Sequence, residues 1–207
     1  MANFKDINNI LPNIKKGDSI CLELGCGEFK ANKSSISIDI IEYPEVDIVG
    51  DIYDVLCTIP SDSVKQIFSS HVFEHLENLP KIFIEIERVL QLDGTLEVIV
   101  PHFSNSFFYS DPTHTKFFGL YTFSYYFRND LFKRSVPNYV MIDGMELIDV
   151  KLVFKSYRPH YISHAIRKIF QLFFNSSRFM QEIYEESFVN FISCYEVQFR
   201  VQKTKLL

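Results

Sequence analysis

The chain has 207 residues, which is enough for one domain with a sizeable core, and 47% of them are hydrophobic, which excludes an intrinsically disordered protein. The net charge is −5 and the sequence pI is about 5.7, so a nucleic acid is not an expected partner. The first residues lack the apolar core of a signal peptide, and no apolar run reaches the length of a transmembrane helix.

The cysteine pattern argues against both disulfides and a zinc centre. The four cysteines form no C-x-x-C pair and no zinc-ligand spacing. Two of them, Cys21 and Cys26, fall in a predicted strand and in the turn that follows it. Reduced thiols are therefore expected, and with them a cytoplasmic location.

The first half of the chain alternates apolar segments with connections. A short helix is expected before Gly17, and a second helix is expected from Pro80, which suits a first helical turn, to Leu90. A turn at 92–94 would close that helix. Strands are predicted at residues 19–24, 35–40, 46–50, 64–70 and 95–100. Strands separated by crossovers favour an α/β fold with a mainly parallel sheet.

The second half has a different character. Residues 107–132 are densely aromatic and are expected to form a helix plus an irregular loop. Residues 146–154 and 191–201 are predicted strands, and 161–186 is a predicted helix with an apolar stripe. We expect a single domain over 1–207: residues 1–101 form the cofactor-binding half, and 102–207 form an acceptor-side half with a lid loop and an inserted helix.

The turn Gly25-Cys26-Gly27 follows directly on the first predicted strand, and Asp39 ends the next one, twelve residues beyond Gly27. A buried strand, a glycine turn and an acid on the next strand tip form the adenosine-binding edge of a Rossmann-like sheet. The glycines let the backbone approach a ligand closely. We expect Asp39 to accept hydrogen bonds from ribose hydroxyls and Asp51 from the adenine amino group, with Ile52 packed on the ring.

Two features of this edge favour S-adenosylmethionine over a dinucleotide. The third glycine position of a dinucleotide motif is Lys30, and the acid comes too early for that motif. Ten residues lie between Leu24 and Ser35, which leaves room for a helix of at most one or two turns. A pyrophosphate normally rests on that helix, whereas S-adenosylmethionine carries no phosphate. An oxidoreductase that uses NAD or a nucleotide-sugar remains the alternative, although no Tyr-x-x-x-Lys pair is present.

Residues 22–27, 38–39, 50–51, 70–76 and 88–96 together resemble the motifs of the class I S-adenosylmethionine-dependent methyltransferases, over about residues 10–101. The resemblance implies a Rossmann-like sheet of seven strands, five parallel and then an antiparallel closing pair, with helices on both faces. It also implies that Glu23, Gly25, Gly27, Asp39 and Asp51 hold the cofactor, with residues near His71 at its methionine end. With Cys26, Ile40, Ile52 and His71 added, nine residues are expected to contact the cofactor.

A looser resemblance concerns residues 101–104, 110–114 and 184–185. There the chain is similar to small bacterial methyltransferases that are encoded with surface-polysaccharide genes. This similarity implies a sugar-containing acceptor and a place in polysaccharide biosynthesis.

His71, Glu74 and His75 also match the H-x-x-E-H signature of zinc peptidases. That signature needs both histidines on one helical face. Here it follows a predicted strand, and the next helix is expected only near Pro80. We therefore expect no metal, and we expect Glu74 and His75 to organise hydrogen bonds beside the cofactor.

Methyl transfer to a hydroxyl needs an in-line arrangement and a group that takes the proton. His114 is the first candidate base and His102 the second, with Asp111 as the acid that orients a histidine. The alternative for His102 is a strand-end residue bonded to backbone, and for His114 it is helix capping or loop structure. A non-catalytic protein that only binds S-adenosylmethionine is a third hypothesis.

The preferred function is therefore O-methylation of a small or glycan-linked acceptor. The aromatic residues of 107–126 could stack on such an acceptor or pack in a core and lid. The basic, Phe-rich segment 160–174 could contact a membrane surface, or it could pack on the sheet or in a homodimer interface.

Overall fold

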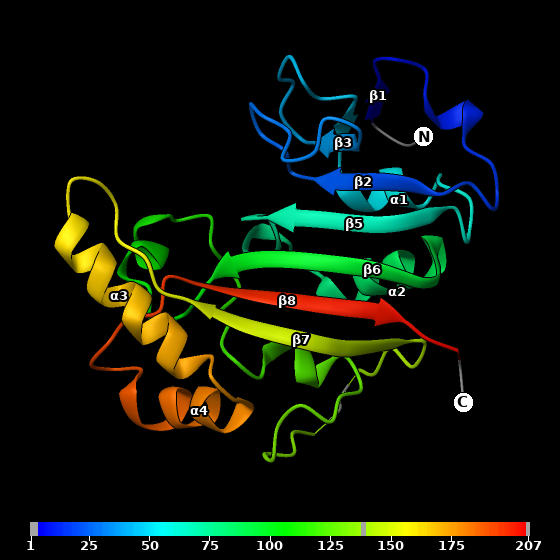
Figure 1. Ribbon diagram of the computed structural model, residues 1–207. Coiled ribbons are helices and arrows are strands. Elements are labelled where there is room, and N and C mark those ends of the chain that lie inside the picture. The colour runs from blue at the N-terminus through cyan, green and yellow to red at the C-terminus, as the bar shows by residue number, and fades with distance from the viewer. Residues whose placement is uncertain (1–3, 138–139, 206–207) are drawn as a thin grey trace.

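The computed structural model describes residues 4–137 and 140–205, and one mixed sheet organises them (Figure 1). The strand order is β1-β4-β3-β2-β5-β6-β8-β7. The strands are β1 (Phe4–Asp6), β2 (Ile20–Leu24), β3 (Ile36–Asp39), β4 (Ile48–Gly50), β5 (Val64–Ser70), β6 (Leu90–Pro101), β7 (Met145–Val153) and β8 (Glu196–Lys203). Five neighbours, β4 to β6, run parallel, and β8 and then β7 close the sheet antiparallel. This confirms the predicted Rossmann-like α/β fold.

The predicted number of seven strands was wrong by one, because the N-terminal segment forms a strand and not the expected helix. β1 pairs antiparallel with β4, with Phe4 opposite Gly50. After β1, the Asp6 carboxylate accepts hydrogen bonds from the backbone N–H groups of Ile10 and Leu11, at 2.9 and 2.8 Å. These bonds bend the chain into a single 3-10 turn at Leu11–Asn13.

Among the described residues, four α-helices accompany the sheet: α1 (Ile52–Leu56), α2 (Leu79–Val89), α3 (Tyr161–Phe174) and α4 (Arg178–Ile183). In Figure 1, α1 and α2 lie behind the sheet, while α3 and α4 lie at the end of the molecule beside β7. The helix predicted from Pro80 is α2, which begins one residue earlier and buries Ile82, Phe83 and Ile86. Short 3-10 helices occur at Phe73–His75, Ser106–Ser110 and Thr122–Tyr125, and a π-helical turn at Tyr184–Phe188.

The helix predicted over 161–186 is divided at Asn175. The side chain of Asn175 accepts a hydrogen bond from the Leu152 N–H at 2.9 Å and donates to the Leu152 carbonyl at 2.7 Å. This pairing with β7 ends α3, and the Ser177 hydroxyl then caps α4. Residues 92–94, predicted as a turn, lie inside β6, and the last strand begins at Glu196 and not at 191.

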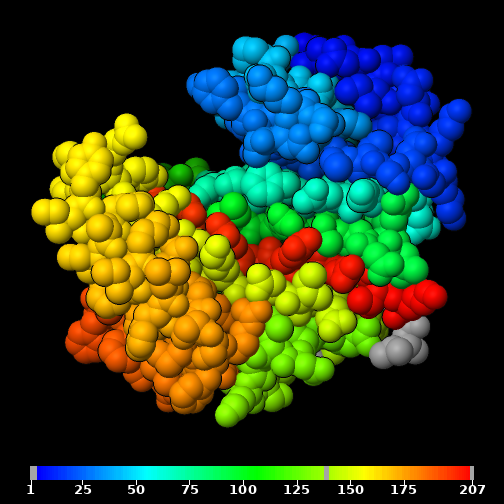
Figure 2. Space-filling model, viewed as in Figure 1, coloured from blue at the N-terminus to red at the C-terminus, as the bar shows by residue number. Residues whose placement is uncertain are grey.

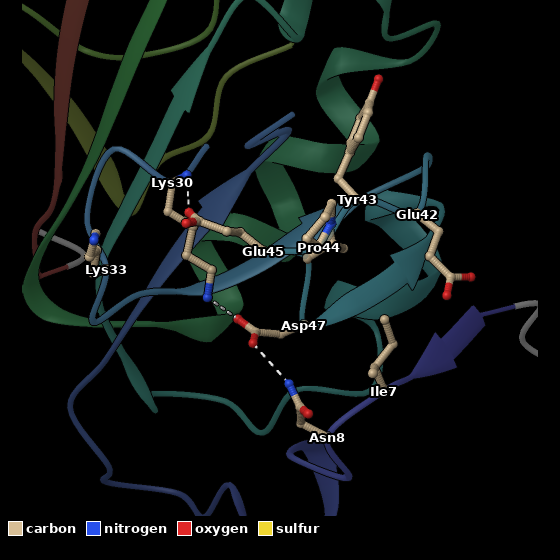
Figure 3. A pocket seen from close by; sticks show the side chains of 10 residues that line it. Ile7, Asn8, Lys30, Lys33, Glu42, Tyr43, Pro44, Glu45 and Asp47 are labelled. Carbon is tan, nitrogen blue, oxygen red and sulfur yellow. Dashed lines mark hydrogen bonds and ion pairs between the residues drawn. The ribbon is translucent and has the colours of Figure 1, made fainter. Parts of the chain in front are cut away.

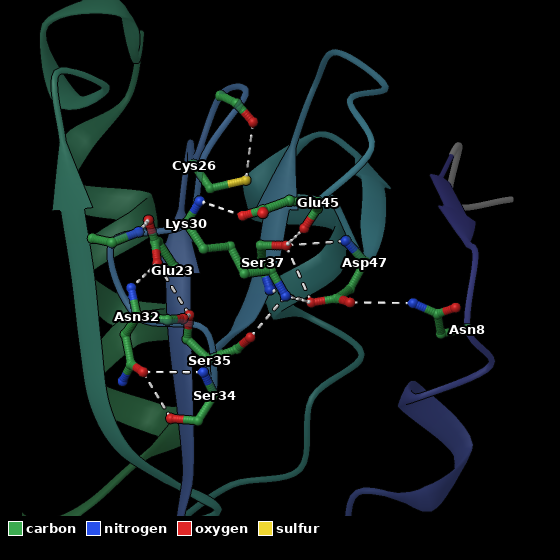
Figure 4. A network of polar contacts seen from close by, with 12 residues as sticks. Asn8, Glu23, Cys26, Lys30, Asn32, Ser34, Ser35, Ser37, Glu45 and Asp47 are labelled. Carbon is green, nitrogen blue, oxygen red and sulfur yellow. Dashed lines mark hydrogen bonds and ion pairs between the residues drawn. The ribbon is translucent and has the colours of Figure 1, made fainter.

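The connection between β2 and β3, for which a helix of at most one or two turns was expected, contains no helix, and polar contacts hold it instead (Figure 4). Glu23, which is buried, accepts hydrogen bonds from the Ala31 N–H, the Asn32 N–H and the Ser35 hydroxyl, at 2.7, 3.2 and 3.0 Å. One carboxylate thus replaces several backbone hydrogen bonds that a helix would have made.

Lys30, at the position of a third glycine, ties the same connection to β4. Its ammonium group forms an ion pair with Asp47 and donates to the Ser35 carbonyl at 3.0 Å. Burial opposes the ionisation of Asp47, but hydrogen bonds from Lys30 and Ser37 hold the pKa of its carboxyl below the ordinary value. A hollow of about 630 Å³ beside this pair is lined by residues that include Lys30 and Asp47 (Figure 3). The charges of Lys30 and Asp47 neutralise each other, so this pair offers a ligand no net charge in the hollow.

Candidate active site

A pocket of about 780 Å³ lies at the carboxyl ends of the parallel strands, where open α/β sheets bind their ligands. Figure 2 shows a notch at this edge, between the blue N-terminal residues and the yellow segment around α3. Seven of the nine residues that the sequence assigned to the cofactor line the pocket: Gly25, Gly27, Asp39, Ile40, Asp51, Ile52 and His71. The predicted glycine edge and strand tips are thus brought together.

The two glycines serve different needs. Gly25 has φ of +70°, and a Cβ built on it would lie 2.0 Å from Val72 Cγ2, so side-chain packing leaves no room there. Its N–H donates to the Ile38 carbonyl at 2.7 Å, which joins the turn to β3. Gly27 has φ of +57°, and a Cβ there would meet nothing within 4 Å. Gly27 therefore leaves open space on the ligand side of the turn.

Asp39 is 8% exposed and lies at the end of β3, where both of its oxygens are held by backbone. Oδ2 accepts from the Gly27 N–H and Oδ1 from the Ile41 N–H, each at 2.9 Å. Each carboxylate oxygen keeps a further lone pair. The carboxylate is therefore fixed in orientation and still able to accept two hydrogen bonds from adjacent hydroxyls.

Asp51 and the isoleucines complete the wall of the pocket. Asp51 is the N-cap of α1: its Oδ1 accepts from the N–H groups of Tyr53 and Asp54, at 2.8 and 3.2 Å. Its second oxygen, Oδ2, can accept from a ligand amino group. Ile52 is buried and Ile40 is 72% exposed, and both line the pocket. Apolar surface of this kind suits a flat ring.

Glu23 and Cys26 are the two assigned residues that do not appear in the pocket lining. The oxygens of Glu23 are engaged by residues 31–35. The Cys26 thiol donates to the Gly27 carbonyl at 3.4 Å, and burial raises the pKa of this thiol. Both side chains stabilise the glycine turn and the residues next to it. Their contact with a cofactor stays a prediction.

His71 follows β5 in an unusual conformation, with φ of +58°. Its Nε2 lies 2.9 Å from Glu196 Oε1, and its Nδ1 lies 3.4 Å from Glu74 Oε1. The hydrogen bond to the Glu196 carboxylate, and then the nearby Glu74 carboxylate, raise the pKa of His71 to about 9. The pocket wall therefore carries an imidazolium at neutral pH. Sequence reasoning missed Glu196, since no motif links it to residue 71.

The segment that carries Asp111 and His114 is attached to the turn after β5. The backbone carbonyl of Glu74 accepts from the N–H groups of Thr115 and Lys116, at 2.9 and 3.3 Å. His114 Nε2 then lies 3.6 Å from Asp111 Oδ2, so the structure brings these two predicted residues together. However, the hydrogen bond that orients His114 is donated by its Nδ1–H to the Phe108 carbonyl at 2.9 Å, and Asp111 faces the opposite nitrogen.

His102 is fully buried and does not line the pocket. Its Nδ1 accepts from the Ser104 N–H at 3.1 Å, so its Nε2 carries the proton and donates to Glu185 Oε2 at 3.0 Å. Glu185 Oε1 accepts from the Leu120 N–H at 2.9 Å. These partners match the structural alternative for His102, and its catalytic role stays a prediction.

The comparisons with known proteins agree with this geometry. A family described as "Methyltransferase domain" matches residues 22–98, the segment that forms the pocket. A SAM-dependent methyltransferase from Archaeoglobus fulgidus is 17% identical, with a TM-score of 0.57 over 93% of this chain and 89% of its own. The YcgJ protein from Bacillus subtilis is 13% identical, with a TM-score of 0.53 over 95% of this chain and 96% of its own.

Among curated proteins, no sequence matches the chain significantly. At these identities the two solved structures establish a shared fold only. The matched domain covers residues 22–98, which include the residues that line the pocket. Residues 22–98 thus match a methyltransferase domain, and the chain shares the Rossmann-like fold of these solved structures.

Proposed function

We propose that this protein transfers a methyl group from S-adenosylmethionine to a hydroxyl oxygen of a small or glycan-linked acceptor. The observation that supports this most is Asp39, held rigidly with accepting lone pairs to spare beside the open space at Gly27. That arrangement fits the ribose of S-adenosylmethionine and the methionine moiety attached to it. When bound, S-adenosylmethionine supplies an electrophilic methyl group on a sulfonium with a good leaving group.

The chain's own contribution to the reaction is mainly positional. Asp39 and the glycine turn would fix the ribose, while Ile40 and Ile52 would hold the adenine ring. Binding donor and acceptor in line supplies much of the rate of such a displacement. A hydroxyl acceptor must also lose its proton, and the candidate for this role is His114, whose ring contacts that of His75, a residue of the pocket lining.

Exposed aromatic side chains near His114 support a sugar-containing acceptor. Phe107, Tyr109 and Phe117 are 59%, 65% and 60% exposed. The Phe108 ring lies between Phe117 and His114, at centroid distances of 4.9 and 4.8 Å. Aromatic faces of this kind can stack on the apolar face of a sugar ring. A glycan-linked acceptor would therefore find a binding platform on the same loop as the proposed proton acceptor.

The donor assignment is tested by calorimetric titration of the protein with S-adenosylhomocysteine, with NAD in a parallel cell. We expect saturable one-to-one binding of S-adenosylhomocysteine and no heat from NAD. A preference for NAD would favour the oxidoreductase alternative and overturn the proposal. Methyl transfer from labelled S-adenosylmethionine to sugar nucleotides and free glycans then separates an enzyme from a protein that only binds the cofactor.

We also propose that α3 contacts an anionic membrane surface. Its outer face carries Ile162, Ile169 and Leu172, which are 79%, 65% and 76% exposed. The segment 151–181 contains Lys and Arg but no Asp or Glu, although the chain as a whole has a charge of −5. An apolar helical face within a basic segment is typical of interfacial helices. No described helix meets the length and hydropathy needed to cross a bilayer.

Co-sedimentation with phosphatidylglycerol vesicles tests this contact. We expect the protein to bind anionic vesicles better than neutral phosphatidylcholine vesicles, and Ile169→Asp to lose that binding, because a charge would enter the apolar layer. Ile84→Asp is the matched control, since Ile84 is an isoleucine of α2 that is 52% exposed. If the wild type instead forms a dimer that Ile169→Asp dissociates, and binds no vesicles, the face is a homodimer interface and the membrane contact is wrong.

A further inference from the structure

Glu74 is a buried carboxylate without a hydrogen-bonding partner. It is 0% exposed, and among the described residues neither Oε1 nor Oε2 accepts a hydrogen bond. His71 Nδ1 lies 3.4 Å from Oε1, which is an ion-pair contact but no hydrogen bond, and its Nε2 is bound to Glu196 at 2.9 Å. A buried carboxylate in this state is strongly unfavourable unless it binds a cation or is well paired. The surroundings of Glu74 are therefore the place to look for a bound ion.

Two further metal-binding side chains converge on Glu74. His75 is the next residue in the chain, and His114 arrives on the loop that hydrogen-bonds to the Glu74 carbonyl. One ligand atom from each of the three residues lies within 4.8 Å of the others. The His75 and His114 rings are also in contact, with centroids 4.8 Å apart.

The hydrogen bonds of both histidines leave Nε2 available as a ligand. His114 Nδ1 lies 2.9 Å from the Phe108 carbonyl, which can only accept, so Nδ1 carries the proton. The Thr113 hydroxyl donates to Asp111 Oδ1 at 2.6 Å and therefore accepts from His75 Nδ1, which is 2.9 Å away. Metal-binding histidines characteristically donate their second N–H to a carbonyl or to a carboxylate-linked group.

We propose that Glu74, His75 and His114 bind a divalent transition-metal ion, with Asp111 as a fourth ligand. Two imidazoles and a carboxylate suit Zn²⁺, Mn²⁺, Fe²⁺ or Co²⁺ better than Ca²⁺. Metal bonds of about 2.0–2.2 Å require these atoms to approach each other more closely than they do here. His75 and Asp111 lie at the surface side of the cluster and can supply that movement by side-chain rotation.

This proposal departs from the expectation that no metal is bound. That expectation rested on the helix that the peptidase signature requires, and indeed His71 pairs with Glu196 and belongs to no such helix. The third ligand, His114, comes instead from a loop 39 residues beyond His75. No sequence spacing connects the two.

The role of this metal rests on the proposed function, because the ion would act in the same methyl transfer. His75 also lines the cofactor pocket, so an ion at this cluster would sit where donor and acceptor meet. Three or four protein ligands leave positions for acceptor oxygens, which favours acceptors with neighbouring hydroxyls, as in a sugar. Contact with a metal lowers the pKa of a hydroxyl. The proton would pass to solvent, the oxygen would bond to the methyl carbon, and the carbon–sulfur bond would break toward sulfur. His114 would then be a ligand and not the base.

Metal binding can be measured without any acceptor. We expect chelator-treated protein to take up one Co²⁺ per chain with a ligand-field absorption band, and Zn²⁺ to displace it. Glu74→Gln and His114→Ala should each weaken Co²⁺ binding by about 100-fold or more, the upper range for disturbed metal sites. His160→Ala is the matched control, because His160 is an exposed histidine at the start of α3, and it should bind Co²⁺ as the wild type does.

Thermal melts add a second readout. Without metal, the melting temperature of Glu74→Gln reports the balance between losing a buried carboxylate that accepts no hydrogen bond and losing its 3.4 Å contact with the His71 imidazolium. With Zn²⁺, only the wild type and His160→Ala should gain stability. The proposal is overturned if the wild type takes up no metal, or if Glu74→Gln and His160→Ala bind it equally. S-adenosylhomocysteine binding reports the donor site separately, so the two proposals can fail independently.

Discussion

Replacing Asp39 by Ala is expected to weaken the binding of S-adenosylhomocysteine by at least 100-fold, about 2.7 kcal/mol. The reason is that the carboxylate is the only group at the tip of β3 with two oriented oxygens for adjacent hydroxyls, and a hydrogen bond to a charged group contributes about 1.5–3 kcal/mol. The variant also loses the partners of the Gly27 and Ile41 N–H groups, which loosens the turn. Calorimetric titration measures the change directly.

Asp39→Asn is the matched variant, because it keeps the shape and one accepting oxygen. We expect an intermediate affinity from it, together with a melting temperature close to that of the wild type. If Asp39→Ala is folded by circular dichroism and binds S-adenosylhomocysteine as tightly as the wild type, the ribose does not lie at Asp39. The donor orientation proposed here would then be wrong.

The second large effect is expected at Gly25, this time on folding. Gly25→Ala places a Cβ 2.0 Å from Val72 Cγ2, at a φ of +70°. The left-handed backbone costs about 1–2 kcal/mol for a residue with a Cβ. Overpacking adds about 1–3 kcal/mol. Since a domain is stable by only about 5–15 kcal/mol, we expect a fall in melting temperature of roughly 5–20 °C or a failure to fold.

Two companion variants separate the steric cost from the backbone cost. Gly25→Ala combined with Val72→Ala relieves the clash and should recover part of the lost stability. Gly27→Ala has a similar φ but open space around the new Cβ, so it should destabilise less and instead obstruct the ligand. Equal melting temperatures for the wild type and Gly25→Ala would contradict the packing argument.

Local patterns predicted several residues that line the pocket. The glycine turn, Asp39, Asp51 and Ile52 all lie within thirty residues, and each position follows from a strand end in a parallel sheet. The chain length between β2 and β3 likewise limited any helix there to one or two turns, and the structure has none. Glu23 shows the limit of such reasoning, since a buried acid near a glycine turn can hold the turn as well as a ligand.

The other side of the site depends on contacts between distant segments. Glu196 meets His71 only because β8 lies between β6 and β7 in the sheet. This strand order is set by the whole sheet and by no local pattern around either residue. The Glu74 carbonyl accepts hydrogen bonds from the Thr115 and Lys116 N–H groups, and these bonds hold the neighbouring His114 beside Glu74. The N-terminal helix was predicted wrongly for a related reason: three residues with little pattern of their own become a strand because the edge of β4 offers backbone partners.

That same strand has a consequence for the solubility of the protein. An uncovered β4 would present unpaired N–H and C=O groups to other molecules and invite edge-to-edge aggregation. β1 satisfies that edge with only three residues, and it exposes Lys5, whose ammonium group is paired with Glu42 at 2.8 Å. A short strand with a charged side chain is a poor template for further pairing. β1 thus ends the sheet on this side, and a variant that removes it would keep the donor pocket but lose its protection against self-association.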